Sequence, residues 1–420
     1  MPHEQKQPVA RVLTLALGAT TAMWIFSYIA LLFSGKIGGE ILFILGGLCL
    51  PKAAMHAKNL REGAWVGFVS ALLNVLLVGS IVGGKTPAEM VSAGIYWVVG
   101  LFVVSIILGV IGASFHERFK DRTRSIDWQF AFLMVASTLV FLMLVSGGLV
   151  TGMEAGLAVP DWPNSYGHNM LLYPLAEMIS IENEGVFFEH AHRLTGMFVG
   201  LTSLIMVVCV WRWNASGGAR SLALAIFLLV CLQGLLGGLR VTEINLWYGV
   251  VHGVVGQLIF ASVVCLAVLF SSNWKFSEKI TNQGDARYAT LLCIAMVLQL
   301  MLGAVYRHMI GDEALAPKAT HILYTHIALA FLVLVFAIIV GVRCMHRGNS
   351  LLKKLGIMLH SLVLLQLLLG GAALIVILIN NGESHPLYEV LVTTAHQANG
   401  ALLLGASFAT LVFVLRLKRV

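Results

Sequence analysis

Twelve apolar runs dominate the sequence, and most of them are about 20 residues long. An α-helix needs roughly 20 apolar residues to cross the hydrocarbon core of a bilayer, so each run predicts a transmembrane helix. The second run is short and ends at Pro51. The predicted spans are 12–33, 38–51, 63–83, 92–115, 129–151, 192–212, 220–240, 248–270, 288–308, 322–343, 355–380 and 391–415.

The composition agrees with a membrane protein and excludes several other classes. Hydrophobic residues make up 59% of the chain and charged residues only 11%, whereas a soluble domain carries about 25% charged residues. A soluble enzyme, a disordered chain and a nucleic-acid-binding domain are therefore excluded, and no nucleic-acid partner is expected. We predict an all-α polytopic membrane protein with about 12 transmembrane helices.

Lys and Arg lie mostly on one side of the predicted spans. Twelve spans place both termini on the same side, and 21 of the 27 Lys and Arg fall in the segments on that side. Because Lys and Arg are enriched on the cytoplasmic face, we predict that both termini are cytoplasmic. The first span, 12–33, is too long for the apolar part of a signal peptide and is expected to be retained. The six cations on the predicted outer side are Lys36, Lys85, Arg193, Arg240, Arg307 and Lys318.

A polar stretch, 116–128, separates a front block of four helices, 1–115, from a body of eight helices. Three outward-running helices of the body repeat a Gln that is followed four residues later by Gly. Small residues at such positions serve helix packing alone or let a flat ligand come close. The repeat predicts two pseudo-symmetric four-helix bundles, 129–270 and 288–416. The pairs are Gln233/Gly237, Gln299/Gly303 and Gln366/Gly370.

Every inward-running helix of the body carries a His near its predicted outer end, namely His192, His252, His326 and His396. An ionisable residue inside a membrane helix is a functional-site hypothesis by default. Two imidazoles from two helices of a bundle can ligate one heme iron from both faces. The natural pairs are His192 with His252 and His326 with His396, which predicts two heme sites. A zinc or copper site would need Cys, Met or carboxylate companions, and only Glu189 offers itself.

The two predicted heme sites differ chemically. Glu189 precedes His192 by three residues, so both project from one helical face, whereas the second half has Ile322 or Leu323 at that depth. A carboxylate one turn above an axial ligand can take or give protons at the heme edge. We therefore expect the first site to be catalytic and the second to store electrons. The alternative is an interfacial carboxylate that is paired with Arg193.

Other residues near the outer end belong to the candidate site. The loop sequence GLVTGMEAGLAVPDWPNSYG is rich in turn residues and can fold back over the mouth of a bundle. Arg240 and Arg307, at outer helix ends, are candidate partners of heme propionates, with ordinary snorkelling as the alternative. The sequence leaves open whether His190, His308 and His321 take part.

The body resembles the heme A synthase family over roughly residues 129–416. The resemblance is carried by TGMEAGLAVPDWPNSYG, by the E-x-x-H-R pattern that begins at Glu189, and by three histidine contexts. These contexts are VVHGVVGQ around His252, THIALA around His326 and AHQANGALL around His396. The front 115 residues lie outside the resemblance.

The resemblance implies an oxidoreductase of the bacterial cytoplasmic membrane. Such an enzyme oxidises the C8 methyl group of heme O to a formyl group and supplies heme A to cytochrome oxidase. The resemblance implies that Glu189 is the essential carboxylate, that His192 and His252 serve the substrate iron, and that His326 and His396 hold a heme B cofactor. Expected partners are heme O synthase, cytochrome oxidase assembly factors and an electron acceptor, in addition to the lipid bilayer.

The sequence departs from the family pattern in two places. Some members place two cysteines in the loop, but the matching positions here are Val159 and Ser165, so a loop disulfide is not expected. The front block is expected to be a structural or partner-docking domain, with a fused assembly subunit as the alternative.

Two functions from other classes remain as alternatives. The first is a di-heme electron-transfer cytochrome, which would not need an acid at only one of its sites. The second is a heme-binding transporter or chaperone, which would place ionisable groups through the whole membrane depth. The clustering of such groups at the outer end favours the enzyme.

Overall fold

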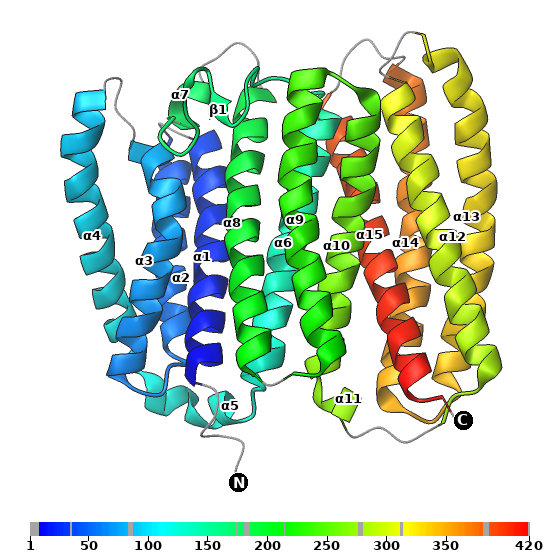
Figure 1. Cartoon of the computed structure of the whole chain (residues 1–420), viewed down its shortest axis with the longest axis horizontal. Helices are drawn as coiled ribbons and strands as arrows, with labels where there is room; N and C mark the ends of the chain where they lie inside the picture. The colour runs from blue at the N-terminus through cyan, green and yellow to red at the C-terminus, as the bar shows by residue number, and fades with distance from the viewer. Residues whose placement is uncertain are drawn as a thin grey trace. The chain divides into compact units, whose positions relative to one another are not determined.

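The computed structural model describes twelve helices that are long and apolar enough to cross a membrane. This confirms an all-α polytopic membrane protein, and Figure 1 shows the course of the helices. The structure describes residues 8–33, 36–82, 87–173, 175–179, 185–213, 215–275, 280–310, 314–380 and 386–418. Among the cations counted for orientation, Lys6, Lys85, Lys279 and Arg419 lie outside these residues, and the orientation itself stays a prediction.

The long helices match the predicted spans in order. They are α1 (Pro8–Leu32), α2 (Ile37–Ala54), α3 (Leu60–Val82), α4 (Pro87–Ala113), α6 (Trp128–Gly152), α8 (Gly185–Arg212), α9 (Gly217–Glu243), α10 (Leu246–Phe270), α12 (Gln283–Met309), α13 (Ala316–Met345), α14 (Ser350–Asn380) and α15 (Leu387–Arg416). Short elements connect them: the 3-10 helix η2 (His116–Phe119), α5 (Lys120–Arg124), β1 (Asn164–Ser165), β2 (His168–Asn169), α7 (Leu175–Ile179) and α11 (Ser272–Lys275).

Several helices extend beyond their apolar runs. Helix α8 begins at Gly185, seven residues before the predicted start at residue 192, so Glu189 lies inside the helix. Helix α2 continues to Ala54 and contains Pro51, where the predicted span ends. Hydropathy falls where the apolar run ends. The helix continues beyond that point because its backbone groups must stay hydrogen-bonded near the membrane.

The chain forms two compact units. The first comprises Met1–Leu139 and Ala158–Thr202, and the second comprises Val140–Leu157 and Ser203–Val420. The boundaries cut α6 and α8, and therefore do not follow the division into 1–115, 129–270 and 288–416, which rests on the sequence repeat and stays a prediction.

In the first unit, small residues bring helices into backbone contact. A Cβ at Gly63 or Gly67 of α3 would collide with the backbone of α4 at Gly109 and Ser105. This Gly-x-x-x-Gly spacing is a common membrane packing surface. Between α1 and α3, buried polar groups pair with each other: Trp24 Nε1 donates to Asn74 Oδ1 at 2.9 Å.

In the second unit, consecutive helices form the hairpins α9/α10, α12/α13 and α14/α15. A cluster around Asp285 fastens one end of the α12/α13 hairpin. The Asp285 carboxylate is 4% exposed, completes a capping box with Asn282, and accepts hydrogen bonds from Arg343 Nε (2.8 Å) and Arg347 Nη2 (2.6 Å).

Replacing Asp285 with Ala is expected to destabilise the second unit by about 2 kcal/mol. The change removes the Asp285 half of the capping box, although Asn282 still caps α12, and it leaves two arginines without their carboxylate. The cost stays below that of breaking a fully buried pair because these arginines are partly exposed. A thermal unfolding curve of the purified protein should shift to lower temperature. Asp285→Asn, which keeps a capping oxygen, should lose less, and equal melting temperatures for all three proteins would contradict this role.

Candidate functional site

Three histidines of the second unit each pack on the glycine of the preceding helix. A Cβ built on Gly237 would lie 3.3 Å from Cε1 of His252. The same atom on Gly303 or Gly370 would lie 3.0 Å from Cε1 of the following histidine, His326 or His396. The repeated Gly therefore leaves room for an imidazole, which explains the spacing seen in the sequence.

The glutamine of each repeat orients the imidazole. Nδ1 of His326 lies 3.1 Å from the backbone oxygen of Gln299, and Nε2 lies 3.1 Å from Nε2 of the same Gln. A carbonyl oxygen only accepts, so Nδ1 carries the proton, and Nε2 accepts a hydrogen bond from the Gln299 side-chain amide. A metal-bound histidine is commonly oriented in this way, through Nδ1–H and a backbone carbonyl.

His396 has a matching arrangement on α14 and α15. Its ring nitrogens lie 3.2 and 3.3 Å from Nε2 of Gln366. Asn399 Nδ2 donates to Gln366 Oε1 at 2.7 Å and so holds the amide in place. The imidazoles of His326 and His396 are close enough to interact electrostatically.

Buried polar atoms without hydrogen-bond partners collect around these histidines. Among the described residues they include Gln299 Oε1 beside His326, Asn399 Oδ1 beside the glutamine that contacts His396, and Gln233 Nε2 near His252. A buried unsatisfied polar group calls for an explanation such as a bound group or water. Two neutral imidazoles among such atoms fit a heme held by His326 and His396. In the described part of the chain, this region included, no three His, Cys, Asp or Glu gather as a metal site.

The other predicted pair is divided between the units. His192 lies on α8 in the first unit, and His252 lies on α10 in the second. Because they belong to different units, their pairing stays a prediction.

One histidine that the sequence left open lies beside His252. The imidazole of His308, on α12, packs against Gly249, where a Cβ would be 2.8 Å from its Cε1. It also interacts electrostatically with His252. In contrast, His321 is exposed on α13. The contact of His308 could not be predicted from a local pattern, because Gly249 lies nearly 60 residues earlier in the chain.

Glu189 is 4% exposed and both of its oxygens have partners. Arg193 Nε donates to Oε1 at 3.1 Å, and the backbone N–H of Val159 donates to Oε2 at 2.7 Å. The structure thus shows the ion pair with Arg193, which does not decide between a catalytic and an interfacial carboxylate. A catalytic role of the carboxylate stays a prediction.

Arg193 of α8 also binds the loop that follows α6. Arg193 donates to the backbone oxygens of Asp161 (2.6 Å), Asn164 (3.2 Å) and Val159 (2.9 Å). Strands β1 and β2 form a small hairpin in this loop, with positive φ at Tyr166 (51°) and Gly167 (76°) as a tight two-residue turn requires.

Two buried side chains also fasten the hairpin to α8. Ser165 Oγ lies 3.1 Å from Nδ1 of His190, and both residues are 0% exposed. Ser165 occupies one of the two positions where some relatives carry a loop cysteine, and here it contributes a hydrogen bond.

Tyr166 makes a hydrogen bond within the loop. Burial raises the pKa of Tyr166, so its phenol stays protonated and donates to the backbone oxygen of Ala158 at 3.1 Å.

The front helices contact both α8 and the loop within the first unit. Tyr28 OH donates to the backbone oxygen of Ala191 at 3.3 Å, one residue before His192. On α3, Ser80 Oγ donates to the backbone oxygen of Leu171 at 3.2 Å. The front block therefore contacts the segment that carries Glu189, and its structural or partner-docking role stays a prediction.

Gly79→Ala is expected to loosen the loop. A Cβ at this position would collide with the backbone oxygen of Leu171, so the loop must move away from α3. Amide hydrogen exchange in residues 158–173 should rise by about tenfold or more, since local opening sets exchange protection. Gly47→Ala on α2 is the matched control because nothing lies within 4 Å of its added Cβ; equal exchange in both variants would contradict the support.

In the second unit, Arg240 and Arg307 contact the last turn of α6 and the segment that follows it. The guanidinium of Arg240 lies against Gly156, where a Cβ would be 2.8 Å from Nη2. Arg307 Nη2 donates to the backbone oxygen of Thr151 at 2.7 Å, and its Nη1 lies 3.6 Å from Glu154 Oε1. Their role toward propionates stays a prediction.

Comparison with known proteins confirms the resemblance seen in the motifs. Residues 130–311 match a family model described as Cytochrome oxidase assembly protein, and this match ends before His326. The chain is 29% identical to a heme A synthase of Rhizorhabdus wittichii over 209 residues, which cover 41% of this chain and 58% of the relative.

Two further relatives bear the same name. The heme A synthase of Shewanella oneidensis is 28% identical over 193 residues, covering 42% of this chain and 56% of the relative. That of Bacillus cereus is 25% identical over 264 residues, covering 59% of this chain and 77% of the relative. The chain thus spans little more than half the length of several relatives it matches.

Proposed function

We propose that this chain, whose residues 130–311 match the cytochrome oxidase assembly family, is a heme A synthase of the bacterial cytoplasmic membrane. It would oxidise the C8 methyl group of heme O to a formyl group by successive hydroxylations and loss of water. An electron acceptor takes up the electrons, and heme A passes to cytochrome oxidase. Heme O synthase and oxidase assembly factors are the proposed partners.

The observation that carries the proposal is a chemical difference between the two halves: only the first has a carboxylate close before its histidine. Glu189 is a buried carboxylate three residues before His192, and a dense set of hydrogen bonds holds it under the loop. The corresponding stretch before His326 contains Ile322 and Leu323. One half therefore has a candidate base and the other has only imidazoles, which suits one reacting site and one electron-storing site.

The chain's own residues have distinct roles in this proposal. His326 and His396, oriented by Gln299 and Gln366, would hold heme B, which supplies one-electron transfer when bound. His192 and His252 would bind the substrate iron. Arg240 and Arg307 would bind propionates through charge-assisted hydrogen bonds.

Glu189 would act as the proton acceptor of the substrate half. Arg193 donates to Oε1 and would balance a negative charge on this carboxylate. The hydrogen bonds from Val159 and Arg193 fix the direction of its oxygens, and its side chain is only 4% exposed. A proton taken from the substrate would reside on Oε2, opposite the oxygen that faces Arg193.

Expression in cells that make heme O but not heme A tests the proposal. Membrane extracts should then contain heme A or its hydroxylated precursor. A di-heme electron-transfer cytochrome or a heme transporter would leave heme O unchanged, and that result would replace the enzyme with one of these alternatives.

A further inference from the structure

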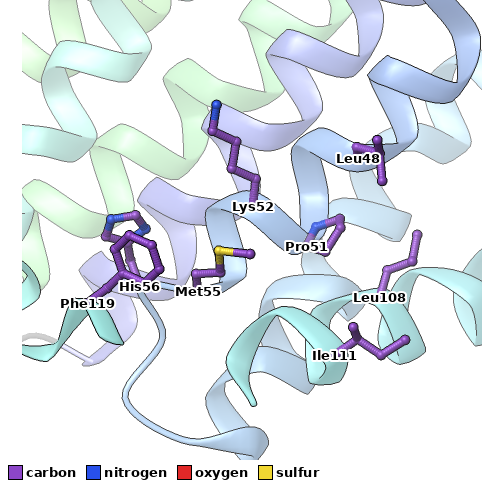
Figure 2. A pocket seen from close by; sticks show the side chains of 8 residues that line it. All are labelled: Leu48, Pro51, Lys52, Met55, His56, Leu108, Ile111 and Phe119. Atoms are coloured by element: carbon purple, nitrogen blue, oxygen red, sulfur yellow. The ribbon is translucent and has the colours of Figure 1, made fainter. Parts of the chain in front are cut away.

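A cavity of about 580 Å³ lies in the first unit, between α2, α4 and η2 (Figure 2). Its volume is within the roughly 300–1,000 Å³ that small-molecule sites occupy. Leu48 of α2, Leu108 and Ile111 of α4, and Phe119 of η2 supply apolar walls. Lys52 and His56, both near the C-terminal end of α2, are its cationic and imidazole groups.

The cavity arises from the way in which α2 and α4 meet. A Cβ at Gly112 would collide with the backbone oxygen of Pro51, so the two helices touch backbone to backbone there. One turn earlier on α4, Leu108 lines the open space between them. The two helices are in contact at Gly112, and the cavity lies beside this contact.

Both helices that form the walls expose most of their surface. Only 22% of the α2 span and 11% of the α4 span are buried inside the structure. Leu48 is 53% exposed and Ile111 is 49% exposed. A long apolar side chain on a membrane helix with this exposure faces lipid, so the cavity is accessible to an acyl chain.

The charge at the cavity favours an anionic head group. Lys52 is exposed in the last turn of α2. The neighbouring acid, Glu117 of η2, is paired with Lys120 at 3.2 Å and with His116 at 3.0 Å. Lys120 lowers the pKa of Glu117, so this carboxylate stays ionised and paired. In the described part of the chain, no ion pair of Lys52 is seen.

The polar groups lie at one end only. The His56 ring packs on Phe119 with 5.2 Å between ring centroids, and Lys52 is one helical turn before His56. The remaining walls are apolar. This arrangement suits a ligand with one charged head and a hydrocarbon tail, whereas a quinone would need hydrogen-bond partners for carbonyls on both sides of its ring.

We propose that the hollow between α2, α4 and η2 binds one anionic glycerophospholipid, whose acyl chain lies against Leu108 and Ile111 and whose phosphate pairs with Lys52. Basic pockets between membrane helices on the cytoplasmic side commonly bind anionic head groups. The site gives the front block a function that does not depend on the heme chemistry proposed above.

Native mass spectrometry of the full chain tests this. The protein is purified into an equal mixture of phosphatidylglycerol and phosphatidylcholine with identical acyl chains, then washed with detergent. One phosphatidylglycerol should remain bound in clear preference to phosphatidylcholine. Lys52→Gln should reduce that preference about fivefold, the factor that corresponds to about 1 kcal/mol per Lys near an anionic surface.

Control variants separate head group from tail. Lys353→Gln removes another exposed lysine, on α14, and should leave the preference unchanged. Leu108→Trp fills the cavity, so this variant should lose the retained lipid although Lys52 is intact. Its control is Leu364→Trp, at a 60% exposed position of α14, which should keep the lipid. The proposal would be overturned by equal retention of both lipids or by retention of a quinone in their place. It would also be overturned if Lys52→Gln had no effect on the lipid preference.

Discussion

Glu189→Gln is expected to lower the yield of heme A by at least about 100-fold, the usual contribution of a general base. Glutamine keeps an oxygen that can accept the Val159 N–H, so the loop should stay in place. It cannot take a proton from the substrate. The extracted hemes should therefore be heme O or an alcohol intermediate together with an undiminished amount of heme B.

The retained heme B distinguishes a chemical role of Glu189 from a structural one. Arg193→Lys serves as the companion variant, because it keeps the positive charge but loses the forked contacts with three loop carbonyls. We expect this variant to have a looser loop and a reduced but measurable yield. Full heme A yield from Glu189→Gln would remove the carboxylate from the mechanism.

His326→Ala is expected to abolish heme B binding in the second half. Nδ1 of His326 donates to the backbone oxygen of Gln299, so Nε2, which accepts from the Gln299 side-chain amide, is the ring nitrogen that has a lone pair for a metal, and alanine offers no replacement. Bound heme B should fall to less than about a tenth of one per chain, since even loss of a supporting group around a metal ligand costs 10–100-fold in affinity. Absorption spectra of the purified protein measure this directly.

Two variants on neighbouring positions make the test specific. His321→Ala changes an exposed histidine on the same helix and should keep its heme. Gly303→Ala places a methyl group 3.0 Å from Cε1 of His326 and should weaken binding without abolishing it. If His326→Ala retains the heme spectrum, the assignment of this ligand is wrong.

The sequence predicted the helices and the Gln–Gly–His unit because both depend on local patterns. Membrane spans follow from hydropathy over about 20 residues. The four-residue step from Gln299 to Gly303 places both on one helical face, and the following His326 comes from the adjacent helix of a hairpin. The same Gln, Gly and His positions recur in successive hairpins, so this repeat can be recognised in the sequence without a structure.

The contacts around Glu189 could not be predicted in the same way. Val159 lies 30 residues earlier in an irregular loop, and its N–H reaches Glu189 only because the loop folds back onto α8. Tyr28 lies more than 160 residues before Ala191. Such pairs carry no periodic signal, and a Ser165–His190 hydrogen bond involves two residue types that are common in loops and helices.

The helix ends also differed for a physical reason. The run used to place α8 began at residue 192, because Glu189, His190 and Arg193 reduce the local hydropathy. Inside the fold these polar groups are paired with each other and with the loop, so the helix continues through them. Polar residues that a site requires therefore make a membrane helix look shorter than it is.

The hemes that copurify with the chain test the central claim most directly. The protein is expressed in a membrane that supplies heme O, purified, and extracted in acid, and the hemes are identified by chromatography and mass. We predict heme B together with heme O, its hydroxylated product or heme A. Heme B alone would contradict the synthase and favour an electron carrier, and the absence of any heme would contradict the four-histidine assignment itself.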